Sequence, residues 1–297
     1  MLNIRDFWEM KNRLEKIMNS SLLSNFPTFE QIAEGLNPQL LKDFATFYEE
    51  SKFGLELIIE DLSQVTKNTN ILEIGSGIGL LSQYLASKGY RVTSIEPGGQ
   101  GFGMMSNLQE HVSKYFGLTN SNFIFHHSTI EEFNPNSKYG YIISINVFEH
   151  IKDPFQGLRI TKSLLEEGGF ARIITPNYAV PYEPHFHVPI FFSKELTFVI
   201  FRPRILNFKC FDPVGLWDSL NWISIDKVQR MLISESIPYS LSLRATQMYF
   251  QRFEGQNQFV ARKGQFFKFF AINLKFLLKF LPQRLYPILD LTVIKPN

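Results

Sequence analysis

Short apolar runs alternate with amphipathic segments through the middle of the chain. The apolar runs, rich in β-branched and aromatic residues, predict strands at 70–74, 90–96, 122–126, 141–146 and 170–175. Apolar residues at helical spacing between these runs predict helices at 79–88, 103–116 and 153–165. Because strands that alternate with helices form crossover units, this order predicts an α/β fold whose parallel sheet has right-handed connections.

The flanking regions have different patterns. Residues 1–65 are predicted to be mainly helical, and residues 177–223 are rich in Pro and aromatic residues with few periodic elements. A further helix is predicted at 225–236. Two strand-like runs, at 239–251 and 258–262, are expected to complete the sheet.

Composition narrows the class of protein. A hydrophobic content of 44% excludes a disordered chain, and a net charge of +2 gives no general reason to expect nucleic-acid binding. The single cysteine, Cys210, excludes a disulfide framework and a cysteine-based metal site, and it is typical of a reducing compartment. No run of about 18 uncharged apolar residues predicts a membrane-spanning helix. We therefore expect a cytoplasmic protein.

The sharpest motif is LEIGSGIG at 72–79, a predicted strand that leads through a glycine-rich turn into a helix. Dinucleotide sites prefer the spacing G-x-G-x-x-G, whereas here the third glycine comes one residue earlier. Glu73 would repel a pyrophosphate but suits an ammonium group. Glu96 ends the next predicted strand, where a carboxylate can accept both hydroxyl groups of a ribose. An amino acid joined to a nucleoside fits both acids.

Four blocks resemble the class I S-adenosylmethionine-dependent methyltransferases, in the methyltransferase type 11/12 and ubiquinone-biosynthesis O-methyltransferase-like group. They are LEIGSGIG at 72–79, IEP at 95–97, IISINVFEH at 142–150, and LLEEGG at 164–169 followed by IITPN at 173–177. The resemblance implies a Rossmann-like, mostly parallel seven-stranded sheet with helices on both faces. It places the methyltransferase domain at 66–263, between an N-terminal helical region, 1–65, and a C-terminal amphipathic helical extension, 264–297.

The resemblance also implies roles for individual residues. Glu73 and the loop residues would hold the methionine part of the cofactor, and Glu96 would bind its ribose. Ser128, Thr129 and Ile130 would lie near the adenine, and Asn146 and Val147 would line the cofactor cleft. The loop residues in this assignment are Gly75, Ser76, Gly77 and Gly79. The family often has an acid where this chain has Ser128, which weakens the adenine assignment.

Methyl transfer to oxygen requires removal of a proton, and a histidine can act as the base. His150, at the end of the fourth-strand block, and His185 and His187, after the fifth strand, are the candidate catalytic residues. Alternatively, Glu149, His150 and one of the two later histidines hold a divalent metal. Of His185 and His187, we assign His187 as the third ligand. A third interpretation gives these residues only a structural role. The segment 177–223 is predicted to form a substrate lid, or else a satellite core.

The segment 264–297 is basic and strongly apolar. Lys268, Lys275 and Lys279 align on one helical face among six phenylalanines in 266–281. The segment has a net charge of +4, which leaves −2 for residues 1–263 of the total of +2. Such a helix suits a membrane surface, self-association as a homodimer, or packing on the domain with its lysines in water.

The sequence thus predicts a methyltransferase that O-methylates a hydrophobic or lipid-linked acceptor at the inner face of the membrane. A surface-glycan precursor and a quinone-type phenol are the leading acceptors, and no DNA partner is expected. RNA 2′-O-methylation is an alternative, against which the slightly acidic range 1–263 argues. A non-catalytic membrane-associated binding protein on the same fold is another, against which the intact glycine loop argues.

Overall fold

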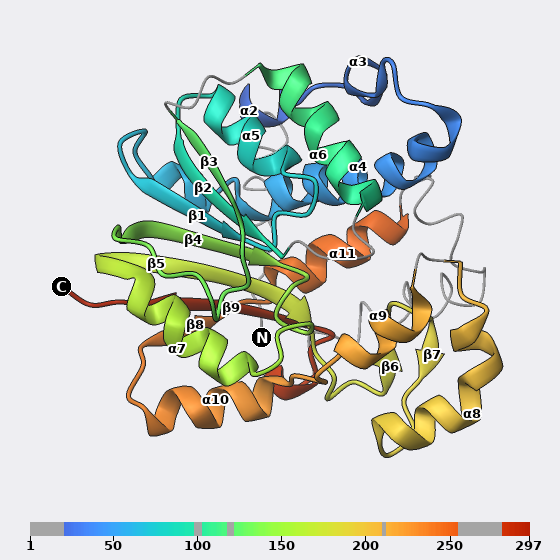
Figure 1. Cartoon of the computed structure of the whole chain (residues 1–297). Coiled ribbons are helices and arrows are strands. Elements are labelled where there is room, and N and C mark those ends of the chain that lie inside the picture. Colours follow the sequence, from blue (N-terminus) through green and yellow to red (C-terminus); the bar gives the residue numbers. More distant parts are fainter. Residues whose placement is uncertain (1–20, 98–102, 118–121, 210–211, 255–280) are drawn as a thin grey trace. The chain divides into compact units, whose positions relative to one another are not determined.

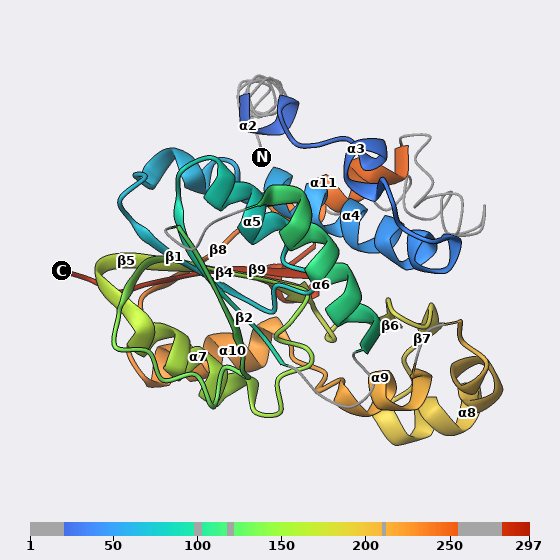
Figure 2. The same cartoon turned by 45° about the horizontal axis from the view of Figure 1, so that its top comes forward.

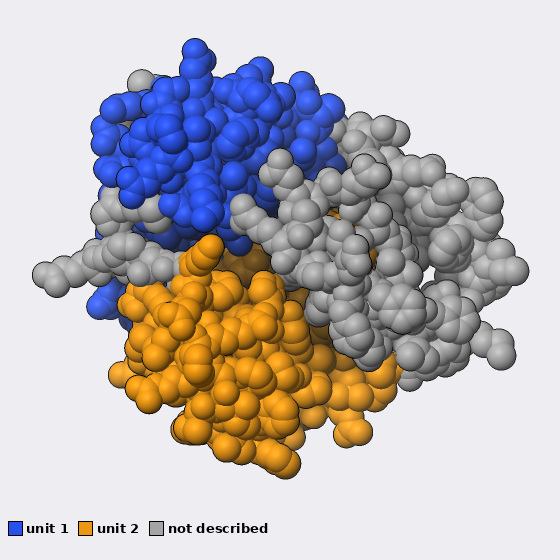
Figure 3. All heavy atoms as spheres, turned by 90° about the vertical axis from the view of Figure 1, so that its right-hand side faces the viewer, with its two compact units in different colours: residues 1–141 blue, residues 142–297 orange. Residues whose placement is uncertain are grey.

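The computed structural model describes residues 21–97, 103–117, 122–209, 212–254 and 281–297 (Figure 1). The chain divides into two compact units, residues 1–141 and residues 142–297 (Figure 3). The strand order is β3-β2-β1-β4-β5-β9-β8, which is the predicted seven-stranded sheet. Strands β1, β2 and β3 are parallel to one another, whereas β9 runs antiparallel to both of its neighbours, β5 and β8.

Unit 1 contains the first three strands and the helices that connect them. β1 (Asn70–Ile74) pairs in parallel with β2 (Arg91–Glu96), which pairs with β3 (Phe123–His127). α5 (Leu80–Ser87) and α6 (Gly103–Phe116) follow β1 and β2. β1 is buried along nearly its whole length, as expected for a parallel strand covered by helices.

The helical prediction for the N-terminal region is confirmed from residue 21 onwards. The elements are α2 (Ser21–Ser24), α3 (Phe29–Ala33), α4 (Pro38–Ile58) and the 3₁₀ helix η1 (Asp61–Gln64). Thr28 begins α3 with a capping box, and Asn37 caps α4 at Leu40 N, just before Pro38 at the first helical position. Local capping chemistry therefore sets both helix starts.

Unit 2 begins within β4 (Tyr139–Ile145) and contains the rest of the sheet. α7 (Pro154–Leu164) leads directly into β5 (Leu165–Pro176), which pairs with the antiparallel strand β9 (Ile288–Ile294). β8 (Tyr239–Leu241) pairs with the other edge of β9. Within this unit α7 and α10 (Ile225–Ser234) lie on one side of the strands, and α11 (Arg244–Glu254) lies on the other (Figure 2).

The predicted lid segment, 177–223, folds into short elements. They are β6 (Tyr182–Glu183), β7 (Val188–Pro189), α8 (Lys194–Leu206) and α9 (Pro213–Ser219). Phe186 and Trp217 are almost fully buried and contact each other with ring centroids 5.5 Å apart. Some aromatic side chains of the segment therefore form a satellite core. This is one of the two interpretations that the sequence left open for 177–223.

The end of the chain differs from the sequence prediction. Only Tyr239–Leu241 of the predicted strand 239–251 is extended, and α11 follows, with Ala245 and Met248 buried three residues apart. The run 258–262 and the lysine–phenylalanine stretch 264–280 lie outside the described residues. The last strand is β9, inside the range assigned to the tail. Its buried residues Leu289, Leu291 and Val293 have the two-residue period of a strand.

Asp290 explains how β9 is held in the sheet. Its carboxylate pairs with the Arg172 guanidinium of β5 through contacts of 2.6 and 2.9 Å, and it also accepts the Ala245 N–H at 3.0 Å. The Arg172 and Asp290 side chains are 9% and 0% exposed. One carboxylate therefore joins β5, β9 and the start of α11, and burial makes this pair dependent on both partners.

No helix within the described ranges is long and apolar enough to span a bilayer.

Candidate functional site

The glycine-rich loop links β1 to α5. Gly75, Gly77 and Gly79 have φ angles of 75°, 54° and 73°. A residue with a Cβ atom is strained in this left-handed region, so three alternate positions favour glycine. The sequence motif is therefore explained by backbone conformation.

Most of the N–H groups of this loop already donate hydrogen bonds within the protein. Those of Gly75 and Ser76 both donate to the Ile95 carbonyl group, at 2.8 and 3.2 Å. That of Gly77 donates to Glu96 Oε2 at 2.8 Å. A pyrophosphate requires N–H groups that point at the ligand. The loop is thus poorly suited to a dinucleotide, in agreement with the interpretation of the motif.

Residues assigned to the ribose and the adenine lie next to each other in unit 1. Glu96 is oriented by the Gly77 N–H, and its carbonyl group accepts the Ser128 N–H at 3.2 Å. Ser128 Oγ donates to the Thr129 carbonyl group at 2.9 Å, and Ile130 is only 3% exposed. The structure therefore brings the two assigned segments together, while their contacts with the nucleoside remain a prediction.

Glu73 is a buried acid beside the loop. Ser82 Oγ donates a hydrogen bond to Glu73 Oε2. The pKa of Glu73 is raised to about 7, mainly by burial and to a smaller extent by the charge of Glu96, while the hydrogen bond from Ser82 lowers it. A cationic ligand would favour the ionised form of this acid.

Cofactor affinity is expected to fall below about pH 7. Protonated Glu73 cannot pair with an ammonium group, so affinity should decrease roughly tenfold between about pH 7.5 and 5.5. Glu73→Gln should bind weakly at all pH values and flatten this dependence. The stability of the unliganded protein should have the opposite trend, because a raised carboxyl pKa contributes stability that is lost as the pH rises through about 7. Calorimetric titration with S-adenosylmethionine checks the first trend, and a wild-type profile as flat as that of Glu73→Gln contradicts it.

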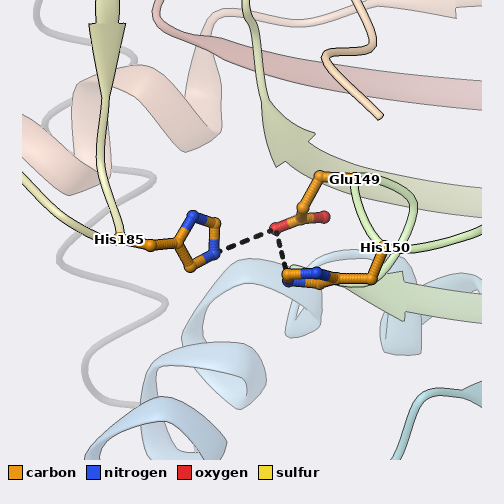
Figure 4. Close-up of side chains that lie close together, drawn as sticks. All are labelled: Glu149, His150 and His185. Carbon is orange, nitrogen blue, oxygen red and sulfur yellow. Dashed lines mark ion pairs between the residues drawn. The ribbon is translucent and has the colours of Figure 1, made fainter. Parts of the chain in front are cut away.

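A second polar cluster follows β4 in unit 2. Glu149 is fully buried, and its Oε2 accepts a hydrogen bond from Thr175 Oγ1. Its Oε1 lies 4.0 Å from His150 Nε2 and 3.8 Å from His185 Nε2. Figure 4 shows both rings beside this carboxylate. Among the residues that the structure describes, none donates a hydrogen bond to this Oε1. Three atoms that can bind a cation therefore converge within 4.8 Å of one another.

Partners from the lid segment position both histidines. His150 Nδ1 lies 2.8 Å from Ser219 Oγ, at the end of α9. His185 Nδ1 lies 2.6 Å from Glu183 Oε1, whose carboxylate also accepts the backbone N–H groups of His185 and Phe186. The two imidazole rings meet edge to face with centroids 5.2 Å apart. Packing and hydrogen bonds thus preorganise the cluster.

The burial of the cluster sets the ionisation of its members. Burial, and then the charge of His185, lowers the pKa of His150 to about 4, so this ring is neutral near pH 7. Burial raises the pKa of Glu149. Burial alone would raise the pKa of Glu183, but its hydrogen bond to His185 and the charge of that ring hold the pKa below the usual range.

His187 does not belong to this cluster, which corrects its assignment to the metal set. Its φ is 55°, and its Nδ1 lies 3.0 Å from Tyr182 Oη. In an extended strand, residues two apart point to the same side. The left-handed conformation of His187 breaks this relation, so His185 faces Glu149 and His187 faces Tyr182.

The loop after β4 has an unusual backbone. Asn146 has a φ of 56°, its N–H donates to the Ile174 carbonyl group at 2.8 Å, and its Oδ1 accepts from Tyr249 Oη at 3.4 Å. The Val147 carbonyl group accepts the His150 N–H at 2.8 Å. Non-glycine residues with positive φ concentrate at functional sites. This conformation therefore supports a functional role for the loop, and contact of Asn146 and Val147 with the cofactor stays a prediction.

Sequence reasoning missed most of the supporting residues. Thr175, Glu183, Ser219 and Asn221 all contact the cluster or its backbone, and Asn221 Nδ2 donates to the Phe148 and Ile151 carbonyl groups. A signal existed only for Glu183, which lies two residues before His185 in a turn rigidified by Pro184. The others come from distant segments, which no local pattern links to Glu149.

Comparison with known proteins defines the class. A family model described as a methyltransferase domain matches residues 32–223. This match exceeds half of the chain, so the chain belongs to that methyltransferase family. It is an S-adenosylmethionine-dependent methyltransferase, as the resemblance of the four sequence blocks predicts.

The chain is similar to two proteins in sequence and to one solved structure in fold. It is 33% identical to the uncharacterized protein Rv1509 of Mycobacterium tuberculosis over 253 residues, 83% of this chain and 85% of that protein. It is 30% identical to the ubiquinone biosynthesis O-methyltransferase of Rickettsia akari over 139 residues, 46% of this chain and 53% of that protein. The structure of Haemonchus contortus phosphoethanolamine N-methyltransferase 2, with phosphomonomethylethanolamine and S-adenosylhomocysteine, is similar with a TM-score of 0.52 at 14% identity. This similarity covers 91% of this chain and 61% of that one, and it shows the fold.

Proposed function

We propose that this methyltransferase transfers its methyl group to an oxygen atom of a hydrophobic or lipid-linked acceptor. The observation that carries the proposal is the buried cluster of Glu149, His150 and His185, because a hydroxyl group must lose its proton to become a nucleophile. The partial similarity to a ubiquinone biosynthesis O-methyltransferase favours a quinone-type phenol as the acceptor. A surface-glycan precursor is the other leading acceptor.

The glycine loop, with Glu73 and Glu96, holds the cofactor in this proposal. The cluster of Glu149, His150 and His185 binds the acceptor hydroxyl group and promotes loss of its proton to water. The oxygen then attacks the methyl carbon, so that a C–O bond forms as the C–S bond breaks. The products are a methyl ether and S-adenosylhomocysteine. Glu73 and Glu96 lie at the carboxyl ends of β1 and β2, and Glu149 and His150 lie in the loop after β4. Open α/β sheets bind ligands at the carboxyl ends of their strands.

Exposed apolar residues support an acceptor presented at the cytoplasmic surface of a membrane. Phe192, just before α8, is 98% exposed, and Val199 and Ile200 on α8 are 69% and 46% exposed. Arg202 and Arg204 are exposed on the same helix. An apolar helical surface bordered by arginines suits contact with anionic lipid. The aromatic residues of the lid segment also suit an apolar acceptor.

The test uses cofactor labelled in its methyl group and two acceptors, a long-chain quinone-type phenol in anionic vesicles and its short-chain soluble analogue. We expect label in an ether that resists alkaline hydrolysis from both acceptors. Phe192→Ser should lose activity several-fold on the vesicle-bound acceptor but retain it on the soluble analogue. The matched control is Phe208→Ser in the neighbouring loop, half-buried against Phe186, which should affect both acceptors alike.

Label that appears only in nitrogen-linked or ester-linked methyl groups contradicts O-methyl ether formation. If the label appears in a lipid-linked glycan extract and not in the phenol, the acceptor is the surface-glycan precursor, and O-methylation still holds. Equal loss of activity on both acceptors in Phe192→Ser contradicts presentation at a membrane.

A further inference from the structure

The hydrogen bonds of His150 determine which of its ring nitrogens carries a lone pair. Ser219 Oγ lies 2.8 Å from the Leu216 carbonyl group, to which it donates its only hydroxyl hydrogen. The same oxygen lies 2.8 Å from His150 Nδ1 and must therefore accept from it. With the proton of the neutral ring on Nδ1, Nε2 carries the lone pair, and this atom faces Glu149.

His185 has the same arrangement. Its Nδ1 lies 2.6 Å from the Glu183 carboxylate, which has no hydrogen to donate, so Nδ1 carries the proton. In the neutral ring Nε2 again carries the lone pair, and it lies 3.8 Å from Glu149 Oε1. A histidine held in this way by a carboxylate is the usual arrangement of a metal ligand.

Glu149 completes a set of three electron-pair donors. Its Oε2 accepts a hydrogen bond from Thr175, while its Oε1 is buried and accepts none from the described part of the chain. A buried carboxylate oxygen without a hydrogen bond or cation is costly. When both rings are neutral, two imidazole lone pairs face this oxygen and increase the repulsion, and a cation among the three atoms removes it.

We propose that Glu149 Oε1, His150 Nε2 and His185 Nε2 bind a divalent transition-metal ion of the zinc type. Two imidazole nitrogens and one carboxylate are a ligand set of catalytic zinc sites, whereas Mg²⁺ and Ca²⁺ prefer oxygen ligands throughout. Ligands about 2.1 Å from a tetrahedral ion lie about 3.4 Å apart. The observed 3.8 and 4.0 Å from Glu149 Oε1 need to close by about half an ångström, and all three atoms lie within 4.8 Å of one another.

The surroundings leave a coordination position for another ligand. The side chains of His150 and His185 are 29% and 22% exposed, whereas that of Glu149 is fully buried. The ion is therefore held from the protein side and accessible from the side of the histidines. Bound there, an acceptor hydroxyl group would be acidified by the ion. This catalytic role rests on the proposed function, but metal binding itself does not.

The test measures metal binding to the full chain without cofactor or acceptor, after treatment with a chelator. Calorimetric titration with Zn²⁺ should give one site per chain, and Co²⁺ should give the absorption bands of a bound ion. Glu149→Gln and His185→Ala should each weaken Zn²⁺ binding by at least about 100-fold, because loss of a supporting residue alone costs 10–100-fold. Ser219→Ala should cost roughly tenfold. Mg²⁺ should not compete.

His187→Ala is the matched control, because it removes a histidine from the same turn but outside the cluster. It should bind Zn²⁺ as wild type does, and retained S-adenosylmethionine binding should show that each variant is folded. The competing explanation is a protonated His185 held between Glu149 and Glu183, with no ion. Absence of a stoichiometric Zn²⁺ site in the wild type, or equal loss in His187→Ala, overturns the proposal. If the ion binds but no acceptor oxygen is methylated, the proposed function fails and the metal site stands.

Discussion

Arg172→Ala is expected to lower the free energy of unfolding by about 3–5 kcal/mol, because it leaves the buried carboxylate of Asp290 without its cation. Asp290→Ala should cost a similar amount, since Arg172 is also buried and the Ala245 N–H loses its acceptor. Both variants weaken the attachment of β9 to β5. Urea denaturation followed by circular dichroism measures the effect.

The double variant Arg172→Met/Asp290→Leu should be much less destabilised than either single variant, because no unpaired charge remains buried. Arg159→Ala provides the control. It breaks an ion pair with Glu235 in the same unit, but Arg159 is 52% exposed, so little change is expected. If Arg172→Ala is as stable as Arg159→Ala, the pair does not hold β9 in the sheet.

Glu96→Ala is expected to weaken S-adenosylmethionine binding by about 10–100-fold. The variant removes the proposed acceptor for the ribose hydroxyl groups, and hydrogen bonds to a charged group contribute about 1.5–3 kcal/mol. It also removes the oxygen that accepts the Gly77 N–H, so the glycine loop loses an internal contact. Calorimetry at constant pH measures the affinity.

Two further variants separate the effect of the Glu96 charge from other effects on cofactor affinity. Glu96→Gln keeps an oxygen acceptor for Gly77 but loses the charge, so it should fall between the wild type and Glu96→Ala. Glu110→Gln removes an exposed carboxylate on α6 that pairs with Lys114, and it should leave the affinity unchanged. Binding by Glu96→Ala as tight as in the wild type would contradict the ribose assignment.

Much of the sheet could be predicted from the sequence. The strands β1 to β4 were each predicted within two residues, whereas β5 begins at Leu165, five residues before its predicted start. The buried strands were found because buried parallel strands are short apolar runs between helices. The last strand was missed although Leu289, Leu291 and Val293 alternate with more polar or exposed positions. Its role as the antiparallel partner of β5 depends on pairing across more than a hundred residues, which local periodicity does not specify. A chain that ends at Lys263 would lack β9.

The candidate site was predicted only in part. Glu149 and His150 were identified from the block that follows β4, but the third member of the cluster was assigned to His187. The choice between His185 and His187 depends on the backbone of the turn, where His187 has a positive φ. A positive φ in a residue other than glycine follows from packing around it, so the sequence carried no direct signal.

The sequence by itself determined the crossover fold, the glycine loop and the positions of Glu73 and Glu96. These features depend on periodicity and backbone conformation within a few residues. Only the tertiary structure decided which side chains meet at Glu149 and how β9 enters the sheet. His150 and Ser219 are 69 residues apart, and Arg172 and Asp290 are 118 apart. Contacts across such separations form only when the whole chain packs, because burial and not local preference selects the partners.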